Sequence, residues 1–136
     1  MILAREAGEQ IEMEDITNNS FMPEACMQGS VEDFYVAMEA HEAHFKKLYQ
    51  AADKMDNKLK FVATYLPGAI DGKIAAVGLQ HIPPPHDFYH LYGKDNIVLF
   101  TTERYVDQPL VIKGAGAGAA VTASGVFADV IRVARV

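Results

Sequence analysis

The sequence lacks most of the features that mark specialised classes of protein. Cysteine occurs once, as Cys26, so neither a disulfide framework nor a C-x-x-C metal pair can form. No apolar stretch approaches the roughly 18 residues of a membrane span, so we expect no membrane partner. The net charge is −6 and no basic run occurs, which argues against nucleic acid. With no secretory signal and a single thiol, we expect a cytoplasmic protein.

The most informative stretch is the last one, residues 108–136. Its apolar run at 110–112 predicts a short buried strand, and the spacing of apolar residues from Ala119 onward predicts one face of a helix. Between the two, three glycines alternate with alanine, at Gly114, Gly116 and Gly118. Glycine permits a positive φ and a close approach to the backbone. The N–H groups that open the helix would suit a phosphate or hydroxyl group.

This loop also fits a dinucleotide-binding fingerprint, because Gly114-x-Gly116-x-x-Ala119 matches G-x-G-x-x-G/A. That fingerprint opens a βαβ unit and needs an acidic residue about 20 residues further on. Here the sequence given ends one helix later, so we reject the fingerprint in its usual sense. Two interpretations of the glycines stay open: a tight strand-to-helix turn, and a contact surface for a nucleotide or another anion.

The first thirty residues predict a helix, a strand and a loop. Residues 1–7 have helical composition and Gly8 is a suitable stop, but no capping residue precedes them, so we expect a piece of something longer. Residues 10–16 alternate between apolar and acidic and predict a strand with one wet face. Residues 18–20 predict a turn, and residues 21–29 a loop.

A long helix is predicted from Ser30, which together with Asp33 matches the capping pattern S/T-x-x-D/E. An apolar stripe then runs for about seven turns: Val31, Phe34, Met38, His41, Phe45, Leu48, Ala52 and Met55. His41 and His44 lie at i, i+3, whereas the zinc pattern H-E-x-x-H needs i, i+4. We therefore expect a partly buried, hydrogen-bonded His41 and no metal site.

The rest of the chain predicts mainly strands. Residues 58–66 and 73–82 predict an antiparallel hairpin around turn signals at 67–72, and residues 97–102 another strand. The prolines at 83–85 predict an extended spacer, with one helical turn within 86–92 and a further turn at 93–96. Three polar residues cluster after these prolines: His86, Asp87 and His90. They predict a polar surface loop, with a functional site as the alternative. Residues 1–136 are thus predicted to form one α+β domain, with a mixed, mostly antiparallel sheet and helices packed on one face.

Three segments resemble one family of enzymes. Q-P-L-V-I-K-G-A-G-A-G-A-A-V-T-A-S-G-V-F-A-D-V-I-R-V-A, from residue 108 onward, resembles the C-terminal signature of homoserine dehydrogenases. G-K-D-N-I-V-L-F-T-T-E-R-Y at 93–105 and I-L-A-R-E-A-G at 2–8 are similar to earlier segments of the same catalytic domain. The V-F-A-D ending and the inserts look most like the bifunctional aspartokinase–homoserine dehydrogenases.

The resemblance implies a function and a cofactor. The family interconverts aspartate 4-semialdehyde and L-homoserine with NAD or NADP, on the path to threonine, methionine and isoleucine. Its lysine and acidic catalytic residues lie near a D-x-x-R-K motif, which this sequence lacks, so no catalytic residue is carried over and none is assigned. Two cofactor contacts are carried over, Gly118 and Thr122. The fragment alone is expected to be inactive.

The resemblance also implies partners. The sheet is expected to form a homodimer, because apolar residues occur on both of its faces and one helix stripe covers only one. The remaining partner is the rest of the same polypeptide, namely a Rossmann domain, with an aspartokinase domain left open. Two alternatives of other classes stay open: a non-catalytic anion-binding module and a dimerisation domain.

Overall fold

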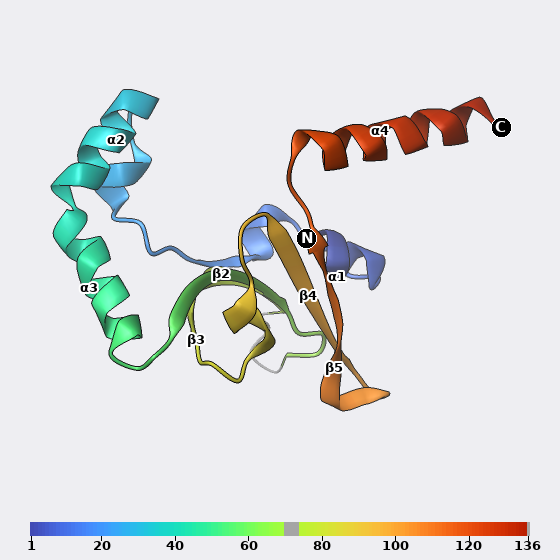
Figure 1. The fold of residues 1–136 in the computed structure, drawn as a ribbon, viewed down its shortest axis with the longest axis horizontal. Coiled ribbons are helices and arrows are strands. Elements are labelled where there is room, and N and C mark those ends of the chain that lie inside the picture. The colour runs from blue at the N-terminus through green and yellow to red at the C-terminus, as the bar shows by residue number, and fades with distance from the viewer. Residues whose placement is uncertain (70–73, 136) are drawn as a thin grey trace. The chain divides into compact units, whose positions relative to one another are not determined.

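The structure is a computed structural model that describes residues 1–69 and 74–135. It divides into two compact units, Met1–Tyr89 and His90–Val136. The helices and strands, in chain order (Figure 1), are α1 (Ile2–Glu6), β1 (Thr17–Asn19), α2 (Val31–Ala40), α3 (Glu42–Asp53), β2 (Lys58–Tyr65), β3 (Ala75–Ile82), β4 (Asp95–Thr102), β5 (Tyr105–Ala115) and α4 (Ala119–Ala134). Short 3₁₀ turns occupy Met13–Asp15, Glu24–Met27 and Asp87–His90. The α+β class is confirmed.

The strands form two sheets where the sequence predicted one. The first unit holds a mixed sheet of order β1-β3-β2, in which β1 is parallel and β2 antiparallel to β3. The second unit holds the antiparallel pair β4-β5. The predicted hairpin of β2 and β3 is confirmed, with Lys58 opposite Ile82 and Tyr65 opposite Ala75. The predicted start of this second strand at Lys73 and the turn signal Asp71-Gly72 lie outside the described residues.

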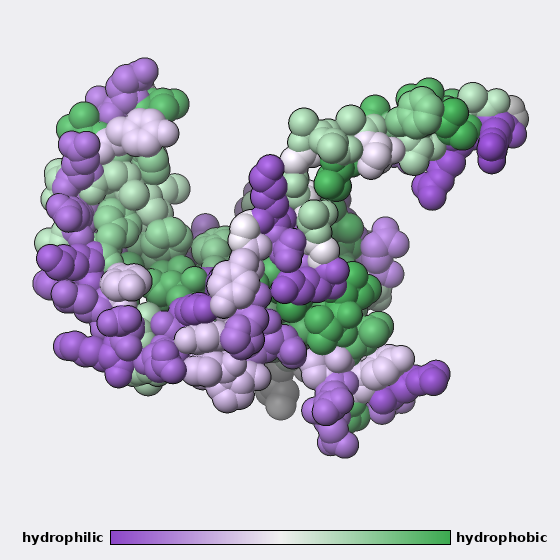
Figure 2. Space-filling view, viewed as in Figure 1, coloured by the Kyte–Doolittle hydropathy of each residue, from purple (hydrophilic) through white to green (hydrophobic). Residues whose placement is uncertain are grey.

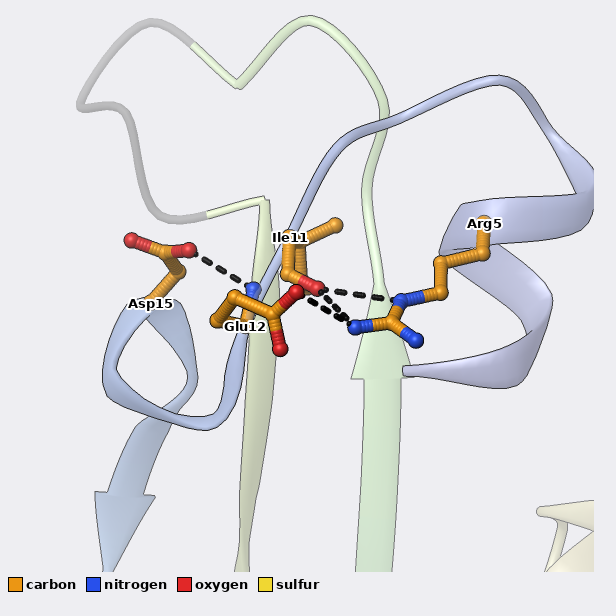
Figure 3. Close-up of polar contacts among 4 residues, drawn as sticks. All are labelled: Arg5, Ile11, Glu12 and Asp15. Carbon is orange, nitrogen blue, oxygen red and sulfur yellow. Dashed lines mark hydrogen bonds and ion pairs between the residues drawn. The ribbon is translucent and has the colours of Figure 1, made fainter.

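The strand predicted at residues 10–16 is wrong. Arg5 donates from Nε and Nη2 to the carbonyl oxygen of Ile11, both at 3.2 Å, and from Nη2 to Glu12 Oε1 at 2.7 Å (Figure 3). The Glu12 N–H then donates to Asp15 Oδ2 at 2.8 Å, which favours a 3₁₀ turn. The side chains of Arg5 and Asp15 thus bond the Ile11 carbonyl and the Glu12 N–H, which a strand would use for pairing within a sheet. Ile11 is buried beside Ala4.

The actual first strand, β1, falls where the sequence predicted a turn. Two of its three residues, Asn18 and Asn19, are poor strand formers, so the sequence of the segment did not predict a strand. The strand forms because β3 offers room beside Gly78, where an added Cβ would lie 2.8 Å from Asn19 Cβ and 3.1 Å from Asn19 O. The pairing is therefore a tertiary effect that brings Asn18 opposite Val77.

The predicted long helix begins as expected but is interrupted. The Asp33 N–H donates to Ser30 Oγ at 3.2 Å, and Asp33 Oδ2 accepts from the Ser30 N–H and hydroxyl, both at 2.8 Å. These bonds, the backbone one foremost, hold the pKa of Asp33 below its ordinary value. The helix breaks at His41, with φ −103° and ψ 17°, where Nδ1 lies 2.8 Å from the Ala37 carbonyl oxygen. A side chain that bonds a last-turn carbonyl ends α2, and α3 starts anew.

Few of the described side chains are buried. The described residues that lie in the core are Ala4, Ile11, Cys26, Ala52, Ala75 and Ile82. The segment 110–112, predicted as a buried strand, is instead exposed, with Leu110 42%, Val111 41% and Ile112 55% accessible. It belongs to a two-stranded sheet, and no helix of its own unit buries it. The described residues thus leave large apolar side chains exposed.

Candidate functional site

The glycine loop follows a hairpin that holds its first residues in register. In the unit His90–Val136, Asp95 lies opposite Ala115 and Asn96 opposite Gly114. The Gly116 N–H continues the ladder by donating to the Lys94 carbonyl oxygen at 3.1 Å. The chain then passes through Gly118 into α4. The predicted order of strand, glycine loop and helix is confirmed, although β5 is longer than expected and contains Gly114.

The three glycines have three different environments. A Cβ built on Gly114 meets nothing within 4 Å, so no described neighbour requires glycine there. A Cβ on Gly116 would overlap the Asn96 amide, with its Cγ at 2.5 Å and its Cβ at 3.1 Å. Gly118 has φ 132° and ψ 146°, a conformation reserved essentially for glycine. Gly116 is thus explained by a close contact, and Gly118 by its backbone.

The start of α4 offers unpaired donors next to Gly118. Gly118 is the N-cap of the helix, and among the described residues no side chain accepts from its first N–H groups. The helix holds no acidic residue in its first turn. Lys94 brings a positive charge here, since its Nζ would lie 3.8 Å from a Cβ on Gly118. The positive end of the helix dipole and this ammonium together favour a negatively charged group.

Thr122 lies in the first turn of α4, as predicted. Its N–H donates to the Gly118 carbonyl oxygen at 3.0 Å, which is an ordinary helical bond. Its side chain is exposed, and the hydroxyl makes no hydrogen bond with any described residue. By contrast, the Ser124 hydroxyl donates to the Val121 carbonyl oxygen at 3.0 Å. Of these two hydroxyls near the helix start, that of Thr122 can bond a ligand without giving up a bond within the chain.

Three histidines of the first unit, His41, His44 and His81, line a pocket of about 490 Å³. The pocket is lined by Asn19, Ser20, Phe21, Met22, Pro23, His41, His44, Leu48, Leu79 and His81. His44 Nε2 lies 2.9 Å from the Phe21 carbonyl oxygen, and His41 Nδ1 is bonded to Ala37. Carbonyl oxygens only accept, so His44 Nε2 and His41 Nδ1 are donors in these two bonds. No group of three metal-binding side chains occurs in the described residues.

Cys26 and the post-proline cluster also show no reactive arrangement. Cys26 is buried, with its sulfur 3.9 Å from His41 Nδ1. Because that nitrogen already carries a proton, it cannot take one from the thiol. In the predicted polar cluster, His86 Nδ1 accepts from the Phe88 N–H at 3.1 Å, a local turn contact.

Within the described residues, no helix is long and apolar enough to cross a membrane.

Two residues of this site escaped sequence reasoning, Lys94 and Asn96. Both belong to the segment G-K-D-N, which the sequence presents as a turn before a strand. The structure lays them beside the glycine loop by strand pairing some twenty positions away in the chain. Such a contact depends on the register of the hairpin, which single-sequence periodicity does not fix. The sequence offered one indication: Asn96 is a poor strand former placed directly before a run of strong ones.

Comparison with known proteins now gives the family. The family described as homoserine dehydrogenase matches residues 1–131. A bifunctional aspartokinase/homoserine dehydrogenase 2 of Zea mays is 36% identical over 98% of this chain and 14% of its own length. A homoserine dehydrogenase of Schizosaccharomyces pombe is 35% identical over 97% of this chain and 35% of its own length. The chain belongs to the homoserine dehydrogenase family.

A solved structure has a similar fold. A crystal structure of a Candida auris protein of unknown function matches 98% of this chain, with 34% sequence identity and a TM-score of 0.78. The chain covers 37% of that protein. The chain thus spans between about one seventh and just over one third of the proteins it matches.

Proposed function

We propose that the chain is part of a homoserine dehydrogenase that interconverts aspartate 4-semialdehyde and L-homoserine, on the path to threonine, methionine and isoleucine. The observation that carries the proposal is the family match over residues 1–131. The full-length polypeptide that contains this chain is expected to reduce NAD or NADP when homoserine is supplied. Absence of that activity from folded full-length protein would contradict the proposal.

The nucleotide is proposed to contact Gly118 and Thr122. Support comes from the exposed hydroxyl of Thr122, the unpaired amides at the start of α4 and the glycine-only backbone of Gly118. A bare backbone lets a ligand come closer than any side chain would allow. NAD and NADP are both consistent with this arrangement.

Residues 1–136 alone are proposed to be inactive. They contain no D-x-x-R-K sequence, and general acid–base groups contribute about 10²- to 10⁴-fold to such a reaction. The test is homoserine-dependent reduction of NADP by the purified chain, beside a mock purification from cells that lack it. Activity in the chain above the mock level would overturn this proposal and leave the family assignment standing.

The apolar surface of α4 is proposed to be covered by the nucleotide-binding part of the same polypeptide. Figure 2 shows mostly hydrophobic residues along this helix. Its large apolar side chains are exposed on more than one side: Val121 43%, Val126 60%, Phe127 66%, Val130 57%, Ile131 38% and Val133 76%. A helix that is apolar around much of its circumference is a buried helix. The relatives' greater length supplies a candidate partner.

Hydrogen exchange tests this cover directly. In the full-length polypeptide, α4 amides should exchange at least about a hundredfold more slowly than in residues 1–136 alone, because burial prevents local opening. The amides of β2 and β3, which pair within the chain, serve as the internal control. Equal exchange of α4 in both proteins would contradict the proposed cover.

A homodimer through the sheet is also proposed. Leu110 and Ile112 point to one face of β5 and Val111 to the other, and all three are exposed. In the separate sheet of the first unit, Phe61 of β2 is 59% exposed. A sheet with an apolar face is stable only when that face is covered. Sedimentation of the full-length polypeptide at micromolar concentration should give a dimer, and Ile112→Glu should weaken it. A monomer, or a dimer unaffected by Ile112→Glu, would contradict this interface.

A further inference from the structure

Asn96 lies directly against the backbone of the glycine loop. The Cβ that glycine lacks at position 116 would overlap the Asn96 carboxamide, and the Asn96 Cβ itself lies 3.1 Å from that point. The carboxamide therefore fills the space that a side chain at position 116 would need. Asn96 sits in β4, one position from the Asp95–Ala115 pair, so the contact is set by the register of the hairpin.

The same short segment fixes Gly116 a second time. The Gly116 N–H donates to the Lys94 carbonyl oxygen at 3.1 Å. Gly116 is thus held by the main chain of residue 94 and by the side chain of residue 96. Only Ala117 separates it from Gly118, and two residues span at most about 7 Å. The position of Gly116 consequently restricts where Gly118 and the start of α4 can lie.

We propose that Asn96 is a positioning residue for the cofactor: by packing its carboxamide on Gly116, it holds the backbone of Gly118 where the nucleotide contacts it. This inference rests on the proposed nucleotide contact at Gly118 and Thr122. Asparagine is a poor strand former, so its place in β4 is not explained by strand propensity. Its place is explained by the contact with Gly116, because a small planar side chain can reach the residue just after the last paired residue of β5.

The first test is Asn96→Ala in the full-length polypeptide, which removes the carboxamide and introduces no overlap. The nucleotide KM should rise about five- to tenfold, while the homoserine KM and the melting temperature stay near their original values. A purely structural role would lower the melting temperature and leave the nucleotide KM in place. An unchanged nucleotide KM overturns the inference.

The second test uses the contact from the other side. Gly116→Ala should raise the nucleotide dissociation constant at least tenfold, because its methyl group displaces Asn96. Gly114→Ala is the matched control in the same loop, since its methyl group meets nothing within 4 Å, and it should change affinity less than twofold. Adding Asn96→Gly to Gly116→Ala removes the overlap and should restore affinity to within about threefold of Asn96→Gly alone. Equal effects of the two alanine variants overturn the inference.

Gly118→Ala distinguishes a failure of this inference from a failure of the proposed nucleotide contact. If Gly118→Ala weakens nucleotide binding but Asn96→Ala does not, the nucleotide contact stands and the positioning role of Asn96 is wrong. If Gly118→Ala leaves nucleotide binding unchanged, the loop is not the cofactor site and both fall.

Discussion

Replacing Thr122 by valine in the full-length polypeptide tests the proposed cofactor contact most directly. Valine has nearly the shape of threonine, and its helix propensity is similar, so α4 keeps its structure. Only the hydroxyl is lost. That hydroxyl is exposed and makes no hydrogen bond with any described residue, so its removal leaves no group within the chain unpaired. The melting temperature should therefore change by no more than about 1–2 °C.

The loss of nucleotide affinity follows from the bond that valine cannot make. A hydrogen bond to a charged group contributes roughly 1.5–3 kcal/mol, which corresponds to about 10- to 150-fold in affinity. Thr122 lies at the surface of the chain, so the lower end applies, and the nucleotide KM should rise about tenfold. The assay is steady-state homoserine oxidation with varied nucleotide at saturating homoserine, beside a thermal melt of each protein.

Ser124→Ala is the matched control for this experiment. Its hydroxyl lies in the same helix, two residues on, but is already bonded to the Val121 carbonyl oxygen. Ser124→Ala should leave the nucleotide KM unchanged within about twofold. The reasoning is refuted if Thr122→Val lowers the melting temperature and leaves the nucleotide KM in place, because Thr122 would then stabilise the helix and contact no cofactor.

Three other substitutions test other parts of the structure. Gly118→Ala should cost roughly 1–3 kcal/mol of backbone strain and raise the nucleotide KM at least tenfold, although its methyl group meets only Lys94, at 3.8 Å; unchanged stability would contradict the φ of 132°, and an unchanged KM would contradict the nucleotide contact. Gly78→Ala should destabilise the chain by about 1–3 kcal/mol in denaturant unfolding, because the methyl group would lie 2.8 Å from Asn19 Cβ; no effect would argue against β1. Ser30→Ala should cost about 1 kcal/mol and raise the pKa of Asp33 part of the way back to its ordinary value, because the hydroxyl bond is lost and the backbone bond remains; NMR titration measures this shift. Since the folded-state pKa of Asp33 is lowered, its contribution to stability is complete above the ordinary pKa of an aspartate and is lost as the pH falls through the lowered folded-state pKa, and this loss should be smaller in Ser30→Ala.

Local signals in the sequence predicted those elements whose cause is local. The capping pair Ser30 and Asp33 predicted the start of α2, and the alternation of apolar and polar residues at 58–66 predicted β2. The break at His41 was missed, because His41 continues the apolar stripe and its bond to Ala37 depends on which rotamer the ring adopts. The segment 10–16 was misread because Arg5, outside the segment, takes the carbonyl of Ile11.

The same division holds for the candidate site. Gly118 and Thr122 were found because the family signature is contiguous in the sequence around them. Asn96 was not found, since its contact with Gly116 exists only once β4 and β5 pair in one particular register. A single sequence contains the glycine spacing but not the alignment of two strands. The division of the strands into two sheets is likewise a property of pairing, which no local pattern contains.

The hairpin of β4 and β5 has a consequence for how this protein can vary. Its bend lies at Glu103 and Arg104, at the far end of both strands from the glycine loop. An insertion in that bend lengthens the tip and leaves the pairing of Asn96 with Gly114 intact. A deletion of one residue within the regularly paired part of β5, between Leu110 and Lys113, shifts the register, turns each following side chain to the opposite face and moves Asn96 off Gly116. Length changes are therefore tolerated near the tip of the hairpin and excluded from its regularly paired part.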